Sequence, residues 1–430
     1  MKIIMSEDSF KYNDWKFIPD GTTIIKVCNK KDLYAVKVDI SSNIVKSLYD
    51  FSVAYFESAH IIATRMLSEM RIDELDSYVF PLFFLYRHSL ELLLKSIGFT
   101  FVLDKSQRKL FLTETFHNLQ SIFEYVLQNT TFPRNEKEKQ WLLTYFENIS
   151  CADASSDSFR FPFHIIEKCN EFGVKQFEIN RVFKKQTHLN LISEANKFEA
   201  AYQILNAWYL DIHEPTVVHS ADEYLECNNT FLDEGGSYYS QSVVGYGYSH
   251  NDFYAYCNGY KECASYLLEY LTKQYDMKIV LNYSHMWYPM CYLYRNTIEL
   301  LLKSIIFQYS NQTWNDKCAV LYYNKHKLCK LFKNIEKFTF EYYDLEDIND
   351  YIKNMLRYCN LLHTFDSDSS KFRYPIDRFC RPYFSNTRYY SFVDIGIFLK
   401  SLASAIDGIC SEIEYRKEII DTLKSEYSGY

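Results

Sequence analysis

One helix-forming stretch occurs twice in this chain: LYRHSLELLLKSI covers residues 85–97, and LYRNTIELLLKSI covers residues 293–305. Further landmarks pair in the same order around it, namely YFESAHII with YKECASYL, HNLQSIF with HKLCKLF, and DASSDSFRFP with DSDSSKFRYP. The offset between paired landmarks drifts only from 205 to 213 residues. Such agreement indicates an internal duplication, so the chain is expected to fold as two copies of one unit.

Each copy has the pattern of a helical bundle. Apolar residues recur three and four positions apart through most of both copies, which is typical of amphipathic helices. Only 11 glycines and 8 prolines interrupt 430 residues, which favours long elements. In the first copy we predict helices over residues 43–70, 78–102, 115–128, 136–149 and 189–212. The predicted fold is mainly α, with two tandem helical bundles that span residues 47–215 and 253–418.

Three segments lie outside the two bundles. Residues 1–46 read as a small β arm, because TTIIKVC and LYAVKVDI are rich in β-branched residues and a polar turn separates them. Residues 216–252 hold a cluster of glycines and are expected to be a linker or a small β element. Residues 419–430 are expected to be a short polar tail.

Charge and composition exclude several classes of function. The net charge is −8 without a basic block, which argues against nonspecific binding to many phosphates and leaves local, shaped contacts with RNA or nucleotide. Twelve scattered cysteines without a CxxC pair suggest free thiols in a reducing compartment. The most apolar stretch, residues 79–103, is interrupted by Arg87, His88, Glu91 and Lys95, so no membrane span is expected. We therefore expect a cytoplasmic protein.

The duplicated helix carries a charged stripe. Arg87, Glu91 and Lys95 are four residues apart and share one helix face. The second copy repeats the stripe with Arg295, Glu299 and Lys303. Two interpretations are open. The stripe is either a solvated ladder of ion pairs, or a charged network in a groove between helices or bundles in which the glutamate holds the arginine.

Two further elements are shared by both copies. His117 and His326 each open a helical segment; either each is a cap or surface residue, or its ring turns toward the stripe and exchanges protons near neutral pH. Arg160 and Arg373 lie in the FR[FY]P segment, where the proline predicts a loop. Each arginine either pairs with a nearby aspartate or binds a carboxylate or phosphate. Convergence of Arg87, Glu91, His117 and Arg160 on one accessible pocket would favour a ligand or substrate, whereas dispersal or burial as closed salt bridges would favour a scaffold.

These motifs together resemble bacterial HEPN-domain proteins. The resemblance rests on the Arg-x-x-x-Glu-Leu-x-Leu-Lys helix, the HxL segment and the FR[FY]P loop, and it covers both bundles. It implies an all-α bundle, often paired, with roles in phage defence, toxin–antitoxin pairs or RNA cleavage. Family ribonucleases use Arg-x(4–6)-His motifs that meet across a dimer in a metal-independent site. Here the strings Arg181–His188 and Arg357–His363 fit that spacing, but they fall at non-equivalent places in the two copies.

Two functions therefore remain open. The first is a HEPN-like protein of bacterial defence or toxin-like biology that contacts RNA, nucleotide or a partner protein and is a candidate ribonuclease. The second is a non-catalytic interaction scaffold; either would be compatible with a homo-oligomer. No sequence motif predicts a cofactor or a metal site. The candidate catalytic residues are His117, His326, Glu91 and Glu299, and the candidate ligand or phosphate-binding residues are Arg87, Lys95, Arg160, Arg295, Lys303 and Arg373.

Overall fold

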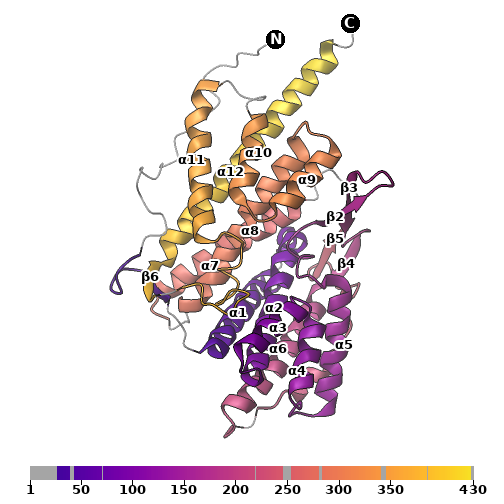
Figure 1. Cartoon of the computed structure of the whole chain (residues 1–430), viewed down its shortest axis with the longest axis vertical. Coiled ribbons are helices and arrows are strands. Elements are labelled where there is room, and N and C mark those ends of the chain that lie inside the picture. Colours follow the sequence, from indigo (N-terminus) through magenta and orange to yellow (C-terminus); the bar gives the residue numbers. More distant parts are fainter. Residues whose placement is uncertain are drawn as a thin grey trace.

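Two sets of six helices follow each other along the chain in the same order. The first set is α1 (Ile44–Ser68), α2 (Ile72–Phe101), α3 (Lys105–Thr115), α4 (Leu119–Asn129), α5 (Glu136–Asp153) and α6 (Leu191–His213). The second set is α7 (Tyr254–Asp276), α8 (Tyr283–Tyr309), α9 (Trp314–Asn324), α10 (Leu328–Thr339), α11 (Leu345–Phe365) and α12 (Phe392–Tyr427). We refer to the two sets as the first and second repeat (Figure 1).

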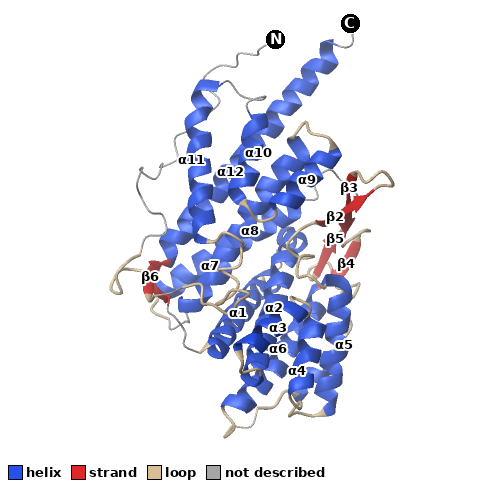
Figure 2. Ribbon diagram, viewed as in Figure 1, coloured by secondary structure: helices blue, strands red, loops and turns tan. Residues whose placement is uncertain are grey.

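The computed structural model describes residues 27–38, 43–69, 71–217, 219–245, 253–279, 283–339, 345–384 and 386–427. Helices dominate these residues, which confirms the predicted mainly α fold (Figure 2). Most of the strand predicted from TTIIKVC lies outside the described residues. Among the described helices, none combines the length and the apolar character that a membrane span requires.

Short strands exchange between the two repeats. The strands are β1 (Ala35–Val38), β2 (Phe163–Cys169), β3 (Lys175–Arg181), β4 (Thr187–Asn190), β5 (Gln241–Val244) and β6 (Arg388–Ser391). The antiparallel hairpin β2–β3 stays within the first repeat. In contrast, β1 precedes α1 but pairs with β6, which leads into α12, whereas β5 precedes α7 but pairs with β4, which leads into α6. Each repeat thus supplies its leading strand to the other.

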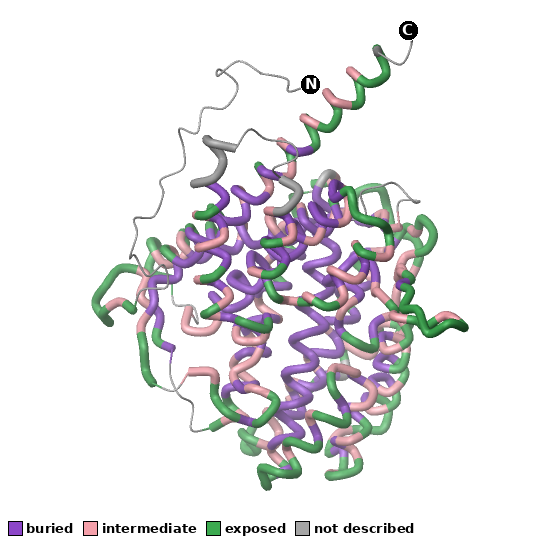
Figure 3. Tube along the Cα trace, turned by 45° about the horizontal axis from the view of Figure 1, so that its top comes forward, coloured by how far each residue is buried: buried purple, intermediate pink, exposed green. Residues whose placement is uncertain are grey.

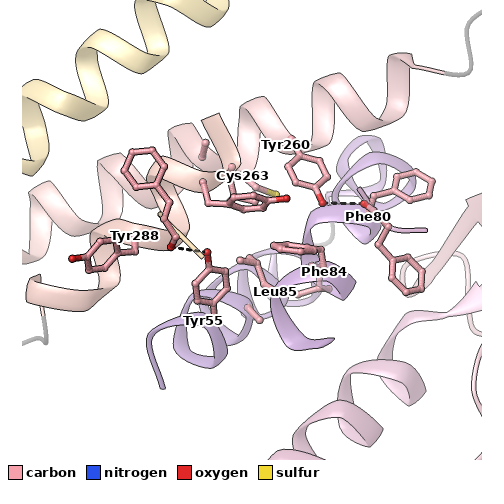
Figure 4. Packing of buried hydrophobic residues seen from close by; sticks show 14 of the residues in the cluster. Tyr55, Phe80, Phe84, Leu85, Tyr260, Cys263 and Tyr288 are labelled. Atoms are coloured by element: carbon pink, nitrogen blue, oxygen red, sulfur yellow. Dashed lines mark hydrogen bonds between the residues drawn. The ribbon is translucent and has the colours of Figure 1, made fainter. Parts of the chain in front are cut away.

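The repeats share one core, and α2 and α8 lie at its centre. Between Leu75 and Phe99 almost every side chain of α2 is buried, which explains why this segment is apolar on nearly all faces (Figure 3). Helix α1 packs against α8, and α7 packs reciprocally against α2. Phe84 and Tyr292, which occupy equivalent positions in the two repeats, stack with their ring centroids 4.7 Å apart. The packing is therefore that of a pseudo-twofold pair. Figure 4 shows side chains of both repeats, among them Tyr55 and Phe84 of the first and Tyr260 and Tyr288 of the second, in this common core.

Several predicted boundaries differ from the structure. Helix α3 was not predicted, because only Phe111 and Thr115 of this helix are buried and its apolar pattern is correspondingly weak. The expected tail at residues 419–430 continues α12 as far as Tyr427. Within 216–252, the described residues hold a short 3₁₀ helix (Asp222–Glu226) and β5. This segment is fixed to the first repeat, for example by the Trp141 indole, which donates to the Cys227 carbonyl at 2.7 Å.

Candidate functional site

The charged stripe of α2 is buried. Arg87 and Glu91 have no exposed side-chain surface, and Lys95 keeps only 5 %. Arg87 Nη1 lies 2.7 Å from Glu91 Oε2, and Lys95 Nζ lies 2.6 Å from Glu91 Oε1. The solvated interpretation of this stripe is therefore wrong, although the i,i+4 ladder itself is present. A glutamate between two cations at this depth offsets their buried charges and fixes both side chains.

His117 joins the same network from the loop between α3 and α4. Phe116 adopts a left-handed backbone conformation (φ 46°), and Asn118 caps α4, so the chain turns His117 toward α2. His117 Nδ1 lies 2.9 Å from Glu91 Oε1, and the His117 carbonyl accepts a hydrogen bond from Arg87 Nη2. Arg87 Nε also lies 3.0 Å from Oδ2 of Asp153 at the end of α5. One arginine thus joins α2, the loop before α4, and α5.

The second repeat builds the same network on α8. Arg295 Nη1 lies 3.1 Å from Glu299 Oε2, and Lys303 Nζ lies 2.6 Å from Glu299 Oε1. His326 Nδ1 lies 2.9 Å from Glu299 Oε1, and its carbonyl accepts from Arg295 Nη2 at 2.8 Å. The fifth member, Asp366, is farther away, with Oδ2 3.9 Å from Arg295 Nε. The candidate site therefore occurs twice, with small differences.

The electrostatics of each network favour a neutral histidine. Burial raises the pKa of Glu91 and of Glu299, but the positive groups around each carboxylate outweigh burial and hold that pKa well below its usual value. An ionised carboxylate only accepts, so the Nδ1 of each histidine carries the proton and Nε2 keeps its lone pair. The Glu299 carboxylate raises the pKa of His326. Burial and nearby positive charges lower this pKa by a larger amount, so the net shift is downward.

The FR[FY]P loops do not fold onto their own bundles, so Arg160 does not converge with Arg87, Glu91 and His117 on one pocket. The loop of the second repeat crosses to the first network, where the Tyr374 hydroxyl donates to Glu91 Oε1 at 2.7 Å. His88 Nε2 lies 3.0 Å from the Arg373 carbonyl. The loop of the first repeat crosses in the opposite direction, and Asn296 Nδ2 donates to the Arg160 carbonyl at 3.4 Å. Each network is thus completed by the other repeat.

Both loop arginines are buried and only partly paired. Arg160 donates from Nε to the Tyr292 hydroxyl at 2.7 Å and from Nη1 to Asp157 Oδ1 at 2.9 Å. Arg373 donates from Nε to the Ser369 carbonyl at 2.7 Å. Among the described residues, Arg160 Nη2 and Arg373 Nη1 have no hydrogen-bond partner. The predicted pairing with a nearby aspartate therefore holds for Arg160 but leaves part of its guanidinium unpaired.

The second network opens into a pocket of about 280 Å³. His326, whose side chain is 28 % exposed, and Lys303 reach it from the second repeat. Phe161, from the first repeat, lies over Lys303 with its ring centroid 4.0 Å from Nζ. The remaining lining residues are Asp157, Pro162, Phe163, His164, Ile165, Phe253, Leu321, Tyr322 and Lys325. No described residue hydrogen-bonds to His326 Nε2, which is therefore available to a ligand.

The two networks differ at the residue that the opposite loop places over them. At the first network Tyr374 donates to Glu91, and its hydroxyl also lies 3.1 Å from His117 Nδ1. At the second network the equivalent residue is Phe161, which has no hydroxyl. The first carboxylate is therefore shared among four donors, because Tyr374 is added to Arg87, Lys95 and His117, whereas Glu299 serves only its own arginine, lysine and histidine. This difference was not predicted, because the crossing of the loops was not.

The two Arg-x(4–6)-His strings do not meet. Arg181 and His188 lie in β3 and β4, whereas Arg357 and His363 lie in α11. Figure 1 places these elements on opposite flanks of the molecule. The two strings therefore do not assemble into one composite site within this chain.

Among the described residues, no group of three or more His, Cys, Asp or Glu side chains is arranged to hold a metal ion. No protein-family model, curated protein or solved structure matches this chain.

Proposed function

We propose that this chain is a HEPN-like protein that binds RNA at the second-repeat pocket and cleaves it there by proton transfer through His326. One observation carries the proposal: a histidine ordered by a buried carboxylate presents its unpaired Nε2 to a pocket that also holds Lys303. The geometry is that of a carboxylate–histidine pair, in which the carboxylate fixes both the tautomer and the direction of the ring.

The chemistry follows from these groups. His326 Nε2 accepts the proton of a ribose 2′-hydroxyl, and the 2′-oxygen then attacks the adjacent phosphorus. The bond from phosphorus to the 5′-oxygen breaks, that oxygen takes up a proton from water, and a 2′,3′-cyclic phosphate remains. Lys303, with the nearby charge of Arg160, offsets the negative charge that develops on the phosphate oxygens. His326 is suited to accept a proton because its lowered pKa keeps the ring neutral at pH 7.

A second function is favoured by a different observation. Arg87, Glu91, Arg295 and Glu299 are fully buried, which is the arrangement of ion pairs that fix packing rather than contact a ligand. In this alternative the duplicated networks only join the helices and loops of an interaction scaffold. The proposed bacterial-defence or toxin-like role and the cytoplasmic location rest on the resemblance and the composition, and they would suit either function.

The equivalence of the two networks provides a matched control. We expect His326→Ala to lower the rate of RNA cleavage by roughly 10²–10⁴-fold, the usual contribution of a general base. His117→Ala removes the same side chain from the Tyr374-covered network and is expected to leave the rate within a few-fold of wild type. Denaturing gels of a fluorescent single-stranded RNA, with circular dichroism as a test of folding, measure both.

If wild type neither binds nor cleaves the RNA, the scaffold is the better description. If both variants lose activity equally while remaining folded, the assignment of the second network as the active one is wrong.

A further inference from the structure

Four exposed lysines lie within seven residues of His326 along the second repeat, and the equivalent positions near His117 hold no lysine. They are Lys325, Lys327, Lys330 and Lys333, and the equivalent positions of the first repeat hold Phe116, Asn118, Ser121 and Glu124. The register is secure because four core positions of α4 and α10 match around these residues. The matched buried pairs are Leu119 with Leu328, Ile122 with Leu331, Phe123 with Phe332, and Val126 with Ile335. We call the four lysines the lysine track.

The lysine track begins at the pocket and continues along α10. Lys325 lines the pocket beside His326, at the end of α9. Lys327 directly precedes α10, and Lys330 and Lys333 follow within α10 at intervals of three residues. At 1.5 Å per residue they span about 9 Å along the helix. The track is therefore long enough to follow a short stretch of one nucleic-acid strand.

The charges of the track are not neutralised within the protein. None of the four lysines forms an ion pair with a carboxylate among the described residues. The N-terminus of α10 adds partial positive charge at the same place. A local cluster of this kind stands out in a chain whose net charge is −8, and it favours an anionic ligand with several charges in a row.

The aromatic walls of the His326 pocket restrict which kind of polyanion would bind at the lysine track. Phe161 and Tyr322 line it together with His326, so it offers aromatic surface on which a base can stack next to groups that contact phosphate. A flat anionic lipid surface would contact the lysines but could not use a concave pocket with aromatic walls. A single strand whose bases are free to turn outward uses both.

We propose that the lysine track binds the sugar-phosphate backbone of single-stranded RNA and leads the strand into the His326 pocket. The inference rests on the proposed function and specifies it further: RNA enters along the start of α10. It also implies that the duplicated sites have diverged, because the first repeat keeps the network of Glu91 and His117 without the cationic path.

The test is the salt dependence of binding in the full chain. The variant Lys327→Glu, Lys330→Glu, Lys333→Glu is compared with Lys30→Glu, Lys105→Glu, Lys137→Glu, which changes the net charge equally at exposed lysines outside the second repeat. Binding of a fluorescent 12-nucleotide RNA is measured by anisotropy from 50 to 300 mM salt. For single strands the slope of log K against log [salt] changes by about 0.7 for each phosphate contact.

We expect the track variant to lose about 2 units of that slope and to bind roughly 100-fold more weakly at 0.1 M salt, since three contacts are removed. The control variant should stay near wild type, and phosphatidylserine vesicles should not compete with the RNA. RNA binding that is weakened equally in both variants, or in neither, overturns the lysine track and leaves the proposed function standing. Absence of RNA binding by wild type overturns both, and competition by vesicles shows that the track is a membrane contact.

Discussion

At the residue scale, both repeats keep a side-chain hydrogen bond to the backbone carbonyl of the arginine in the crossing loop. The residue that donates this hydrogen bond differs between the repeats. His88 Nε2 donates to the Arg373 carbonyl in the first repeat, and Asn296 donates to the Arg160 carbonyl in the second. The two side chains differ in one important respect, because only the histidine titrates. His88 is fully buried, and burial lowers its pKa well below the usual value. Acid therefore lowers the stability of the folded chain through His88, at the loop that contains Arg373. The equivalent Asn296, at the loop that contains Arg160, has no such effect because it does not titrate.

The variant His88→Asn places the residue of the second repeat into the first. Because the folded-state pKa of His88 is lowered, the unfolded chain takes up the proton first, and stability is lost as the pH falls below about 6.5. The variant keeps a donor for the Arg373 carbonyl but removes this loss. Between pH 7.5 and 5.5 we expect its free energy of unfolding to fall by roughly 1 kcal/mol less than that of wild type.

Urea denaturation at each pH measures the difference. The exposed His188→Asn serves as the control and should follow the wild-type pH dependence. Parallel pH profiles for His88→Asn and wild type would show that His88 does not govern the acid sensitivity of the loop contact.

At the element scale, the sequence predicts those helices whose buried face is wide and misses those whose buried face is narrow. Helix α2 was predicted because nearly every residue of its centre is buried, whereas α3 contributes only Phe111 and Thr115 to the core. The hairpin β2–β3 was also missed, although the polar turn at Asn170–Gly173 between two runs with β-branched or aromatic residues is a readable signal.

The candidate site was only half predictable for a related reason. Arg87, Glu91 and Lys95 share a helix face by their spacing alone, so their grouping follows from helical geometry. The loop residue that completes the network comes from the other repeat, and two similar bundles offer each loop two similar docking surfaces. The linear order of the sequence does not distinguish them. Only the packing of α1 on α8 and of α7 on α2 decides that Tyr374 reaches Glu91.

An equivalent buried tyrosine in each repeat donates a hydrogen bond to the crossing loop of the other repeat. Tyr55 donates to the Phe372 carbonyl at 3.1 Å, and the equivalent Tyr260 donates to the Phe159 carbonyl at 2.9 Å (Figure 4). Both hydroxyls cross from α1 or α7 to the loop of the opposite repeat. Removing either donor leaves a buried carbonyl without this partner, which typically costs about 1–3 kcal/mol.

We therefore expect Tyr55→Phe and Tyr260→Phe each to destabilise the protein by about 1–3 kcal/mol, and by similar amounts. Urea denaturation at pH 7.5 measures both. Tyr415→Phe, at an exposed position on α12, is the control and should change stability by less than about 0.5 kcal/mol. A cost confined to one of the two buried tyrosines would mean that the loops are not held equivalently.

At the scale of the whole molecule, the reciprocal contacts make the two repeats one structural unit. Strands β1 and β5 each complete a sheet with the other repeat, the two loops cross, and one hydrophobic cluster contains residues of both repeats. A repeat separated from its partner would lose a strand partner and expose the apolar surface of α2 or α8. The arrangement within one chain thus resembles that of a homodimer with exchanged elements.

Cooperative unfolding of the two repeats follows from this architecture. Ile122→Ala in α4 creates a cavity within the first repeat and should cost about 2–5 kcal/mol. If the repeats open together, hydrogen exchange should accelerate by the same factor in α6 of the first repeat and in the buried part of α12 of the second, because both then exchange through one global opening. Mass spectrometry of peptides from the two helices, in wild type and variant, measures the two factors in a single experiment.

Leu331→Ala, the equivalent change in α10 of the second repeat, should accelerate exchange in both helices in the same way, since Leu331 is buried at the matching position. Faster exchange confined to the repeat that carries the substitution would contradict the argument, because it requires that one repeat stays folded after losing the strand and the loop of the other.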